Sequence, residues 1–337
     1  MKPRDALIIA TVLLIAGFAA ADAIRGRAER TTSTPSTASG ETAQTRLPGP
    51  QPQAQPPPGW PRGTLLGSLV FTDSGDCRIR VIGLAGGVER PLARFGGNCQ
   101  LWAPPVGDRL AYGLGPPSPD GFSPFRIADL GQPNRELGGY RALFGVVLWS
   151  QDGQRVGWCG RRRTGFDLEL GGAARRLPRC PIAYTRDGRP AWTIGNRLYV
   201  AGRLALRANG GITFAHFGTD GSLAIVEDGV QVIRYDARGR FTGAFPTVEG
   251  QTPIFSPDNC AAAYRPQGGY GQITVLDVGC FPGALPGTLR GRDATWSPDG
   301  RWLAVAGRRA IVFQRVVGPP LTVRWPASAV QLAWRAR

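Results

Sequence analysis

Few residues of this chain have the types and spacing that catalysis requires. His216 is the single histidine among 337 residues. No nucleophile motif such as Gly-x-Ser-x-Gly accompanies it, so we interpret His216 as a structural side chain. The acidic pairs Asp73/Asp76 and Glu227/Asp228 stand where turns are expected, and we interpret them as turn formers. The sequence therefore predicts no enzyme active site, no cofactor and no metal site.

Arginine is the residue type that could bind a ligand. Lys and Arg number 40 against 24 Asp and Glu, which gives a net charge of +16. A basic surface attracts nucleic acid, anionic lipid or an anionic wall polymer, and the planar guanidinium suits phosphate and carboxylate. The simpler interpretation is a solvated surface that keeps the protein soluble. The candidate residues for binding an anion or a partner are Arg161, Arg162, Arg163, Arg179, Arg265, Tyr270, Arg290, Arg292, Arg308 and Arg309.

The six cysteines favour disulfides over a metal site. None of them forms a Cys-x-x-Cys motif, and only one histidine is present, so a zinc site is not expected. An even number of cysteines in an exported chain is typical of disulfide bonds. They are Cys77, Cys99, Cys159, Cys180, Cys260 and Cys280.

The first 30 residues look like an export segment. Lys2 and Arg4 precede an uncharged, mostly apolar run over residues 6–21. This pattern predicts either a membrane anchor or a signal peptide that is cleaved at Ala-x-Ala. Either alternative places the rest of the chain outside the cytoplasm, which disfavours nucleic acid as a partner. Residues 31–62, rich in Thr, Ser, Pro and Gln, predict a linker.

The elements that must position the arginines are repeated hairpins. In TWSPDGRWLAVAG, residues 295–307, an aromatic strand end is followed by the turn Pro298-Asp299-Gly300 and an alternating apolar strand. The unit recurs at intervals of 33 to 47 residues, and such a period is the signature of β-propeller blades. The aromatic anchors are Trp102, Trp149, Tyr184, Phe217, Phe255, Trp296 and Trp334.

The two ends of the repeat region complement each other. Residues 68–95 offer three strands without an inner strand, and residues 329–334 offer an inner strand alone. Together they make one blade, which closes an all-β ring of seven four-stranded blades over residues 63–337. Six blades is the alternative, if the weak units at Tyr184 and Phe217 merge.

The propeller topology also predicts the disulfide pairing. We name the strands of a blade A to D from the axis outwards, and the face that carries the B–C turns and the D–A connections is the B–C face. The two cysteines of each sequential pair fall on one face of the ring and in one neighbourhood, with spacings of 22, 21 and 20 residues. We therefore expect Cys77–Cys99, Cys159–Cys180 and Cys260–Cys280.

TWSPDGRWLAVAG, IFSPDN and LWSQDGQ resemble the TolB-type propeller repeat. The resemblance covers most of residues 66–337 and implies the fold. It also implies a scaffold for protein partners in the cell envelope, since that is what propellers of this type mostly do.

We therefore expect a non-enzymatic binding or scaffolding module, tethered to the membrane or secreted. Its partner would be an envelope protein, an anionic wall polymer or a lipid headgroup, bound on the B–C face, with Tyr270 exposed among glycines. The alternative is a propeller enzyme, or a protein that binds a sugar or metal in the central channel.

Overall fold

The computed structural model describes residues 56–336, without residues 62, 94–98, 116–117, 130–135, 144–145, 250, 267–268 and 278–287. The expected export segment and most of the expected linker lie outside the described residues. Within the described ranges, no helix is long and apolar enough to cross a membrane.

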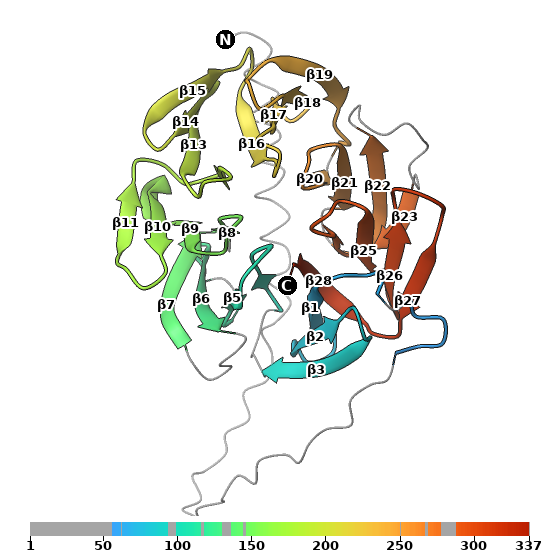
Figure 1. Cartoon of the computed structure of the whole chain (residues 1–337). Coiled ribbons are helices and arrows are strands. Elements are labelled where there is room, and N and C mark those ends of the chain that lie inside the picture. The colour runs from blue at the N-terminus through green and yellow to red at the C-terminus, as the bar shows by residue number, and fades with distance from the viewer. Residues whose placement is uncertain are drawn as a thin grey trace, which may run out of the picture. The chain divides into compact units, whose positions relative to one another are not determined.

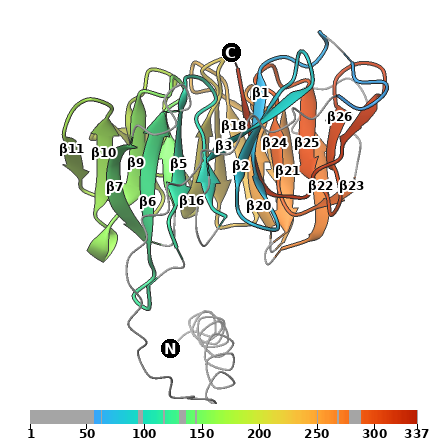
Figure 2. The same cartoon turned by 90° about the horizontal axis from the view of Figure 1, so that it is seen from below.

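Seven four-stranded antiparallel sheets surround a common axis as the blades of a propeller (Figure 1). In side view the strands run through the thickness of the ring (Figure 2). The prediction of seven blades rather than six is confirmed, and Tyr184 and Phe217 lie in separate blades. Each of the predicted aromatic anchors lies in the innermost strand of its blade.

The first three blades have the following strands, in order from the axis outwards. Blade 1 consists of β28 (Ala329–Arg335), β1 (Ser68–Asp73), β2 (Ile79–Gly83) and β3 (Val88–Ala93). Blade 2 consists of β4 (Leu101–Trp102), β5 (Arg109–Gly113), β6 (Phe122–Asp129) and β7 (Glu136–Leu143). Blade 3 consists of β8 (Val147–Trp149), β9 (Arg155–Cys159), β10 (Gly165–Glu169) and β11 (Ala174–Leu177), with the short 3-10 turn η1 (Arg161–Arg163) between β9 and β10.

The other four blades follow in chain order. Blade 4 consists of β12 (Ala183–Tyr184), β13 (Pro190–Ile194), β14 (Arg197–Val200) and β15 (Arg203–Arg207). Blade 5 consists of β16 (Ile212–Phe217), β17 (Leu223–Glu227), β18 (Gln231–Tyr235) and β19 (Phe241–Pro246). Blade 6 consists of β20 (Gln251–Phe255), β21 (Ala261–Pro266), β22 (Gly271–Asp277) and β23 (Thr288–Gly291). Blade 7 consists of β24 (Ala294–Trp296), β25 (Trp302–Ala306), β26 (Ile311–Arg315) and β27 (Thr322–Trp325).

The Ser-Pro-Asp-Gly motif builds the turn between the two inner strands. The buried Ser297 hydroxyl accepts the N–H of Trp302 at 2.9 Å and donates to the Asp299 carboxylate. Gly300 has a φ of 68°, which glycine adopts without strain. Ser150 and Ser256 make the corresponding bonds in blades 3 and 6. The motif aspartates therefore hold turns, as the sequence indicated.

The tryptophan anchors join neighbouring blades. The Trp149 indole N–H donates to the Trp102 carbonyl at 3.0 Å, and that of Trp296 donates to the Ile254 carbonyl at 2.8 Å. Both bonds connect the inner strand of one blade to the inner strand of the blade before it. The recurrence of an aromatic side chain at this position thus has a structural cause in blades 3 and 7.

Strand β28 closes the ring by pairing with β1. The ladder runs from Ser68 opposite Arg335 to Asp73 opposite Ala329. On its other sides, the N–H of Leu332 donates to Asp293 of blade 7 at 2.9 Å, and the Gln331 side chain accepts the N–H of Leu101 in blade 2. The last strand of the ring is therefore held by three blades.

Trp60 belongs to the packed region although it falls within the expected linker. It is 7% exposed, and its indole N–H donates to the Leu84 carbonyl at 2.8 Å. Its ring meets Phe313 and Trp325 edge to face, with centroids 5.5 and 5.2 Å apart. Packing against the blades therefore begins before residue 63.

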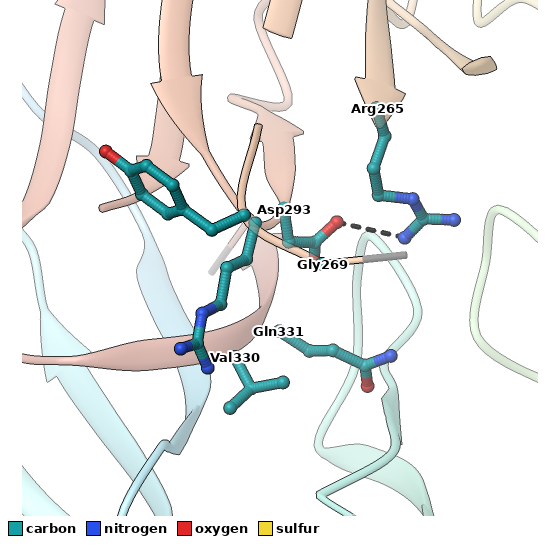
Figure 3. A pocket seen from close by; sticks show the side chains of 7 residues that line it. Arg265, Gly269, Asp293, Val330 and Gln331 are labelled. Atoms are coloured by element: carbon teal, nitrogen blue, oxygen red, sulfur yellow. Dashed lines mark hydrogen bonds and ion pairs between the residues drawn. The ribbon is translucent and has the colours of Figure 1, made fainter. Parts of the chain in front are cut away.

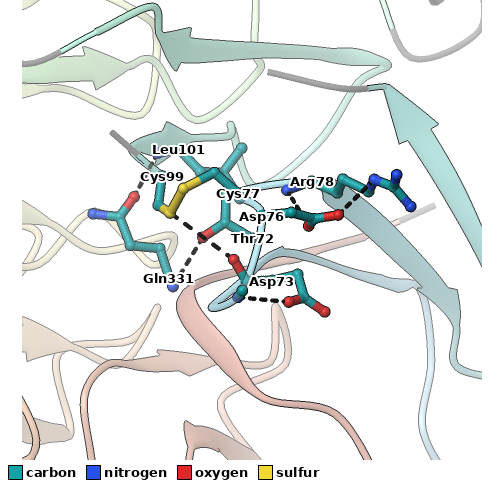
Figure 4. The surroundings of a disulfide bond; sticks show 9 residues. Thr72, Asp73, Asp76, Cys77, Arg78, Cys99, Leu101 and Gln331 are labelled. Carbon is teal, nitrogen blue, oxygen red and sulfur yellow. Dashed lines mark hydrogen bonds and ion pairs between the residues drawn. A yellow bond between two sulfur atoms is a disulfide. The ribbon is translucent and has the colours of Figure 1, made fainter. Parts of the chain in front are cut away.

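Two of the three predicted disulfides are confirmed. Cys77–Cys99 (Figure 4) and Cys159–Cys180 each join a B–C turn or strand end to the D–A connection that leads into the next blade. Their Cα atoms are 4.6 and 4.7 Å apart. Cys260 is disulfide-bonded as well, and its expected partner Cys280 lies outside the described residues. That pairing stays a prediction.

Replacement of Cys159 and Cys180 by alanine together is expected to lower the free energy of unfolding by about 3 kcal/mol. The bond closes a loop with a sequence separation of 21, and opening it restores conformational freedom to the unfolded chain. Urea denaturation of the variant and of the unreduced parent measures the difference. An unchanged midpoint and slope would contradict a stabilising role.

Candidate anion-binding face

The structure places the predicted binding residues in two separate groups on the B–C face. Arg161, Arg162, Arg163 and Arg179 belong to blade 3. The others belong to blades 6 and 7, on the opposite side of the ring (Figure 1). They are Arg265, Tyr270, Arg290, Arg292, Arg308 and Arg309. The sequence suggested one basic face, and the structure divides it.

A pocket of about 500 Å³ lies within the second group (Figure 3). The end of β21, the B–C loop of blade 6, the D–A connection into blade 7 and the start of β28 all contribute to it. Its lining residues, which define the basic pocket, are Arg265, Gly269, Tyr270, Arg292, Asp293, Val330 and Gln331. Three of the predicted residues, Arg265, Tyr270 and Arg292, are thus brought together.

Asp293 is the buried charge of the basic pocket. It is 4% exposed, and its Oδ1 accepts from the Arg265 guanidinium at 2.9 Å (Figure 3). Its Oδ2 accepts the N–H of Leu332. Burial raises the pKa of the Asp293 carboxyl, and the neighbouring Arg265 charge opposes that rise. Asp293 was not among the candidate residues predicted from the sequence. The only local signal for it is its position just before an inner strand.

Arg292 supplies the charge of the basic pocket that remains available. Asp293 offsets the charge of Arg265, whereas the exposed Arg292 side chain has no ion-pair partner within the described part of the chain. A guanidinium without such a partner, beside a neutralised ion pair, gives the pocket a net positive charge. Such a site fits a carboxylate or phosphate group, which the planar fork of arginine binds through paired hydrogen bonds.

Tyr270 is less accessible than predicted. The sequence indicated an exposed ring among glycines, but the residue is half-buried, and the Arg308 guanidinium lies 4.6 Å from its ring centre. A cation over the face of a tyrosine ring is an attractive contact, so Arg308 covers the ring. The expectation failed because Arg308 comes from the next blade, 38 residues along the chain.

The tip of blade 3, Arg161–Arg163, is exposed and strained. Arg162 and Arg163 have φ values of 54° and 57°, and the N–H of Thr164 donates to the Arg161 carbonyl at 3.1 Å. Positive φ at both central residues of a turn favours Asn-Gly and costs arginine energy. Arg161 contacts Asp120 at 3.3 Å and lies over the Phe122 ring. This turn therefore has arginine at two positions where Asn and Gly would make it more stable.

His216 lies away from the basic pocket, in the inner strand of blade 5. Its Nδ1 is 2.6 Å from the Asn259 side-chain oxygen, and its ring stacks on Phe255. Burial lowers the pKa of the imidazole, which favours its neutral form. The described residues hold no group of three or more His, Cys, Asp or Glu side chains that could bind a metal.

The acidic pairs contact the backbone of turns. Asp73 accepts the N–H of Gly75 at 2.8 Å, and Asp228 accepts the N–H of Gly211 at 2.7 Å. Asp76 accepts the N–H of Arg78, and Glu227 accepts that of Gly210. Asp73 and Asp76 thus act as turn formers, as expected. The buried Glu227 ends β17 and Asp228 follows it, and both carboxylates bond to the connection between β15 and β16 instead of to their own turn.

The fold and the blade pattern define this protein as a seven-bladed β-propeller, and the resemblance to the TolB-type repeat is confirmed at the level of that fold. No protein family model and no curated protein sequence matches the chain. The evidence for relatives therefore comes from solved structures.

Two similar solved structures come from Bacteroides. A "putative 6-phosphogluconolactonase" of Bacteroides fragilis has a TM-score of 0.51 and 13% identity, over 80% of this chain and 98% of that one. Its counterpart in Bacteroides uniformis has a TM-score of 0.53 and 14% identity, over 80% of this chain and 99% of that one. TolB of Acinetobacter baumannii is 15% identical over 80% of this chain and 67% of its own, with a TM-score of 0.46. At such low identity, the two Bacteroides structures show a shared fold and carry no activity to this chain.

The double substitution Arg162→Asn with Arg163→Gly is expected to raise the free energy of unfolding by about 1 kcal/mol, because Asn and Gly accept the positive φ values at this turn. Urea denaturation measures the change. Arg161→Asn is the matched control, since Arg161 is not among the residues with positive φ. A destabilised double variant would show that the arginine side chains, rather than the turn, decide stability here.

Proposed function

We propose that this propeller is a non-enzymatic binding module outside the cytoplasm that holds an anionic group of an envelope component in the basic pocket. The observation that carries the proposal is the exposed Arg292, without an ion-pair partner among the described residues, beside the buried Asp293–Arg265 pair. The ligand group is a carboxylate or a phosphate, on an envelope protein, a wall polymer or a lipid headgroup.

The cysteines support a location outside the cytoplasm. Both described disulfides lie on the B–C face, and disulfides form and persist in oxidising compartments. The apolar run at residues 6–21 would deliver the chain to such a compartment, as an anchor or as a cleaved signal. A tether would leave the propeller next to the anionic polymers and headgroups of the envelope.

The positioning of the basic pocket supports binding by a rigid site. The side chain of Gln331, which lines the pocket, accepts the N–H of Leu101, and the Gln331 backbone N–H donates to the Thr72 hydroxyl at 3.2 Å (Figure 4). These residues surround the Cys77–Cys99 disulfide (Figure 4). A pocket wall fixed in this way loses little conformational entropy when a ligand binds.

Retention on isolated cell envelopes should fall steeply as salt rises, because ions at ~0.15 M screen charges beyond about 8 Å.

Arg292→Ser should weaken binding about tenfold or more, since a hydrogen bond between charged groups contributes roughly 1.5–3 kcal/mol. Arg324→Ser is the matched control, because Arg324 is an exposed arginine of the same blade on the outer strand β27.

Replacement of Arg161, Arg162 and Arg163 by serine in the same salt series tells whether the tip of blade 3 takes part. A flat salt response, or equal losses in the Arg292→Ser and Arg324→Ser variants, would contradict the proposed site. Competition with inorganic phosphate and with acetate distinguishes a phosphate ligand from a carboxylate ligand.

The alternative is an enzyme in which Asp293 acts as a general base. A buried carboxyl with a raised pKa in a pocket is a general reason to consider one, and the similar lactonase-like structures share the fold. Against it, both oxygens of Asp293 already accept hydrogen bonds, from Arg265 and from the backbone of β28. This arrangement favours a structural role.

Lactone hydrolysis therefore should not exceed the buffer rate. The measurement is the loss of sugar lactones, phosphorylated and free, followed by pH-stat with the intact chain. The Asp293→Asn variant is the control for any turnover that appears. Hydrolysis that the wild type catalyses and Asp293→Asn abolishes would replace the binding proposal with an enzyme.

A further inference from the structure

The outermost strand of blade 5 differs in charge from the outermost strands of the other blades. β19, Phe241–Pro246 with the sequence FTGAFP, has no charged residue. Each of the other outer strands, β3, β7, β11, β15, β23 and β27, carries at least one arginine. Charged residues on an edge strand disfavour edge-to-edge pairing. β19 is the outer strand that lacks them, although it ends at Pro246 and its ladder with β18 has an irregularity at Tyr235.

β19 is also exposed. Phe241 is 63% exposed, and Thr242, Ala244 and Pro246 are exposed as well. Among the described strands, β19 pairs with β18 alone, on its inner side. Its other side presents backbone groups and apolar side chains to solvent.

The ladder with β18 shows which backbone groups face outwards. The N–H of Thr247 donates to the Val230 carbonyl at 3.1 Å, and Ala244 lies opposite Ile233. Hydrogen-bonded and non-bonded pairs alternate along an antiparallel ladder. The N–H and C=O of Ala244 therefore point to the free edge.

We propose that β19 pairs with β19 of a second copy of this chain, antiparallel and about a two-fold axis between the two Ala244 residues. At this axis the two Ala244 residues exchange both N–H···O=C bonds. Pro246, which lacks an N–H, lies opposite Thr242 of the other copy. This interface lies on the rim of the ring and does not depend on the proposed function.

The distribution of charge favours a second copy as the occupant. Self-pairing of any other outer strand would place arginines along the contact, in a chain whose net charge of +16 already makes two copies repel. At β19 no arginine lies within the paired strands. Continued past the strand ends, the same register would place the exposed Glu249 of each copy opposite the turn between β18 and β19 of the other copy. That turn carries Arg238.

The pairing would leave the B–C face of both rings open, because β19 lies on the rim (Figure 1). Two basic pockets would then belong to one assembly. A polymer with repeated anionic groups could engage both, which raises its overall affinity without any new contact.

Sedimentation of the full chain over a concentration series tests the interface. We expect a monomer–dimer equilibrium, and Ala244→Arg should raise the dimer dissociation constant at least tenfold. Ala205→Arg is the matched control, because Ala205 is an exposed alanine on β15, the outer strand of blade 4. A monomer at every concentration, or a dimer that Ala244→Arg leaves unchanged, would overturn the proposal.

A second variant keeps the test decisive if Ala244→Arg folds poorly. The Cα atoms of a hydrogen-bonded antiparallel pair lie about 5.5 Å apart, which a disulfide spans. Mild oxidation of Ala244→Cys should therefore give a covalent dimer, seen without reductant on a denaturing gel. Ala205→Cys should stay monomeric. Equal cross-linking of the two variants, or none in Ala244→Cys, would count against the two-fold contact.

Discussion

The pairing of β28 with β1 is the interaction on which the ring depends. Without it blade 1 lacks its inner strand, and the inner edges of β1 and of blades 2 and 7 face a gap. Trp334 shows how the strand is seated: its indole N–H reaches the Leu66 carbonyl at 2.9 Å, and its ring packs edge to face on Phe313 of blade 7. Hydrogen bonds from β28 to blades 2 and 7 also hold this strand in place. One strand thus determines whether seven sheets form a closed ring.

The parts of this structure that could be predicted are those encoded in local sequence. An aromatic residue, a turn with a buried serine hydroxyl and an apolar strand recur in a continuous stretch, so blade number, strand order and the Cys77–Cys99 and Cys159–Cys180 bonds follow. The missing inner strand at one end and the spare inner strand at the other predicted closure. In each case a short stretch and a topological rule were sufficient.

The basic pocket could be predicted only in part because its walls come from distant segments. Arg265 and Asp293 are 28 residues apart, and Gln331 belongs to the closing strand. The sequence indicated basic loops on one face, but it could not show that a buried aspartate neutralises Arg265 or that Arg308 covers Tyr270. Those relations depend on side-chain geometry between blades. The split of the arginines between blade 3 and blades 6 and 7 has the same origin.

The closing strand β28 also affects when the basic pocket forms during protein synthesis, because it contributes Val330 and Gln331 to that pocket. β28 is the last strand of the ring to leave the ribosome, and two residues of the basic pocket are among its first. A chain interrupted before this strand could form the hairpins of blades 2 to 7 and still have no pocket. Ligand binding would then distinguish a completed ring from a fragment, because closure of the ring and formation of the basic pocket both require residues of β28.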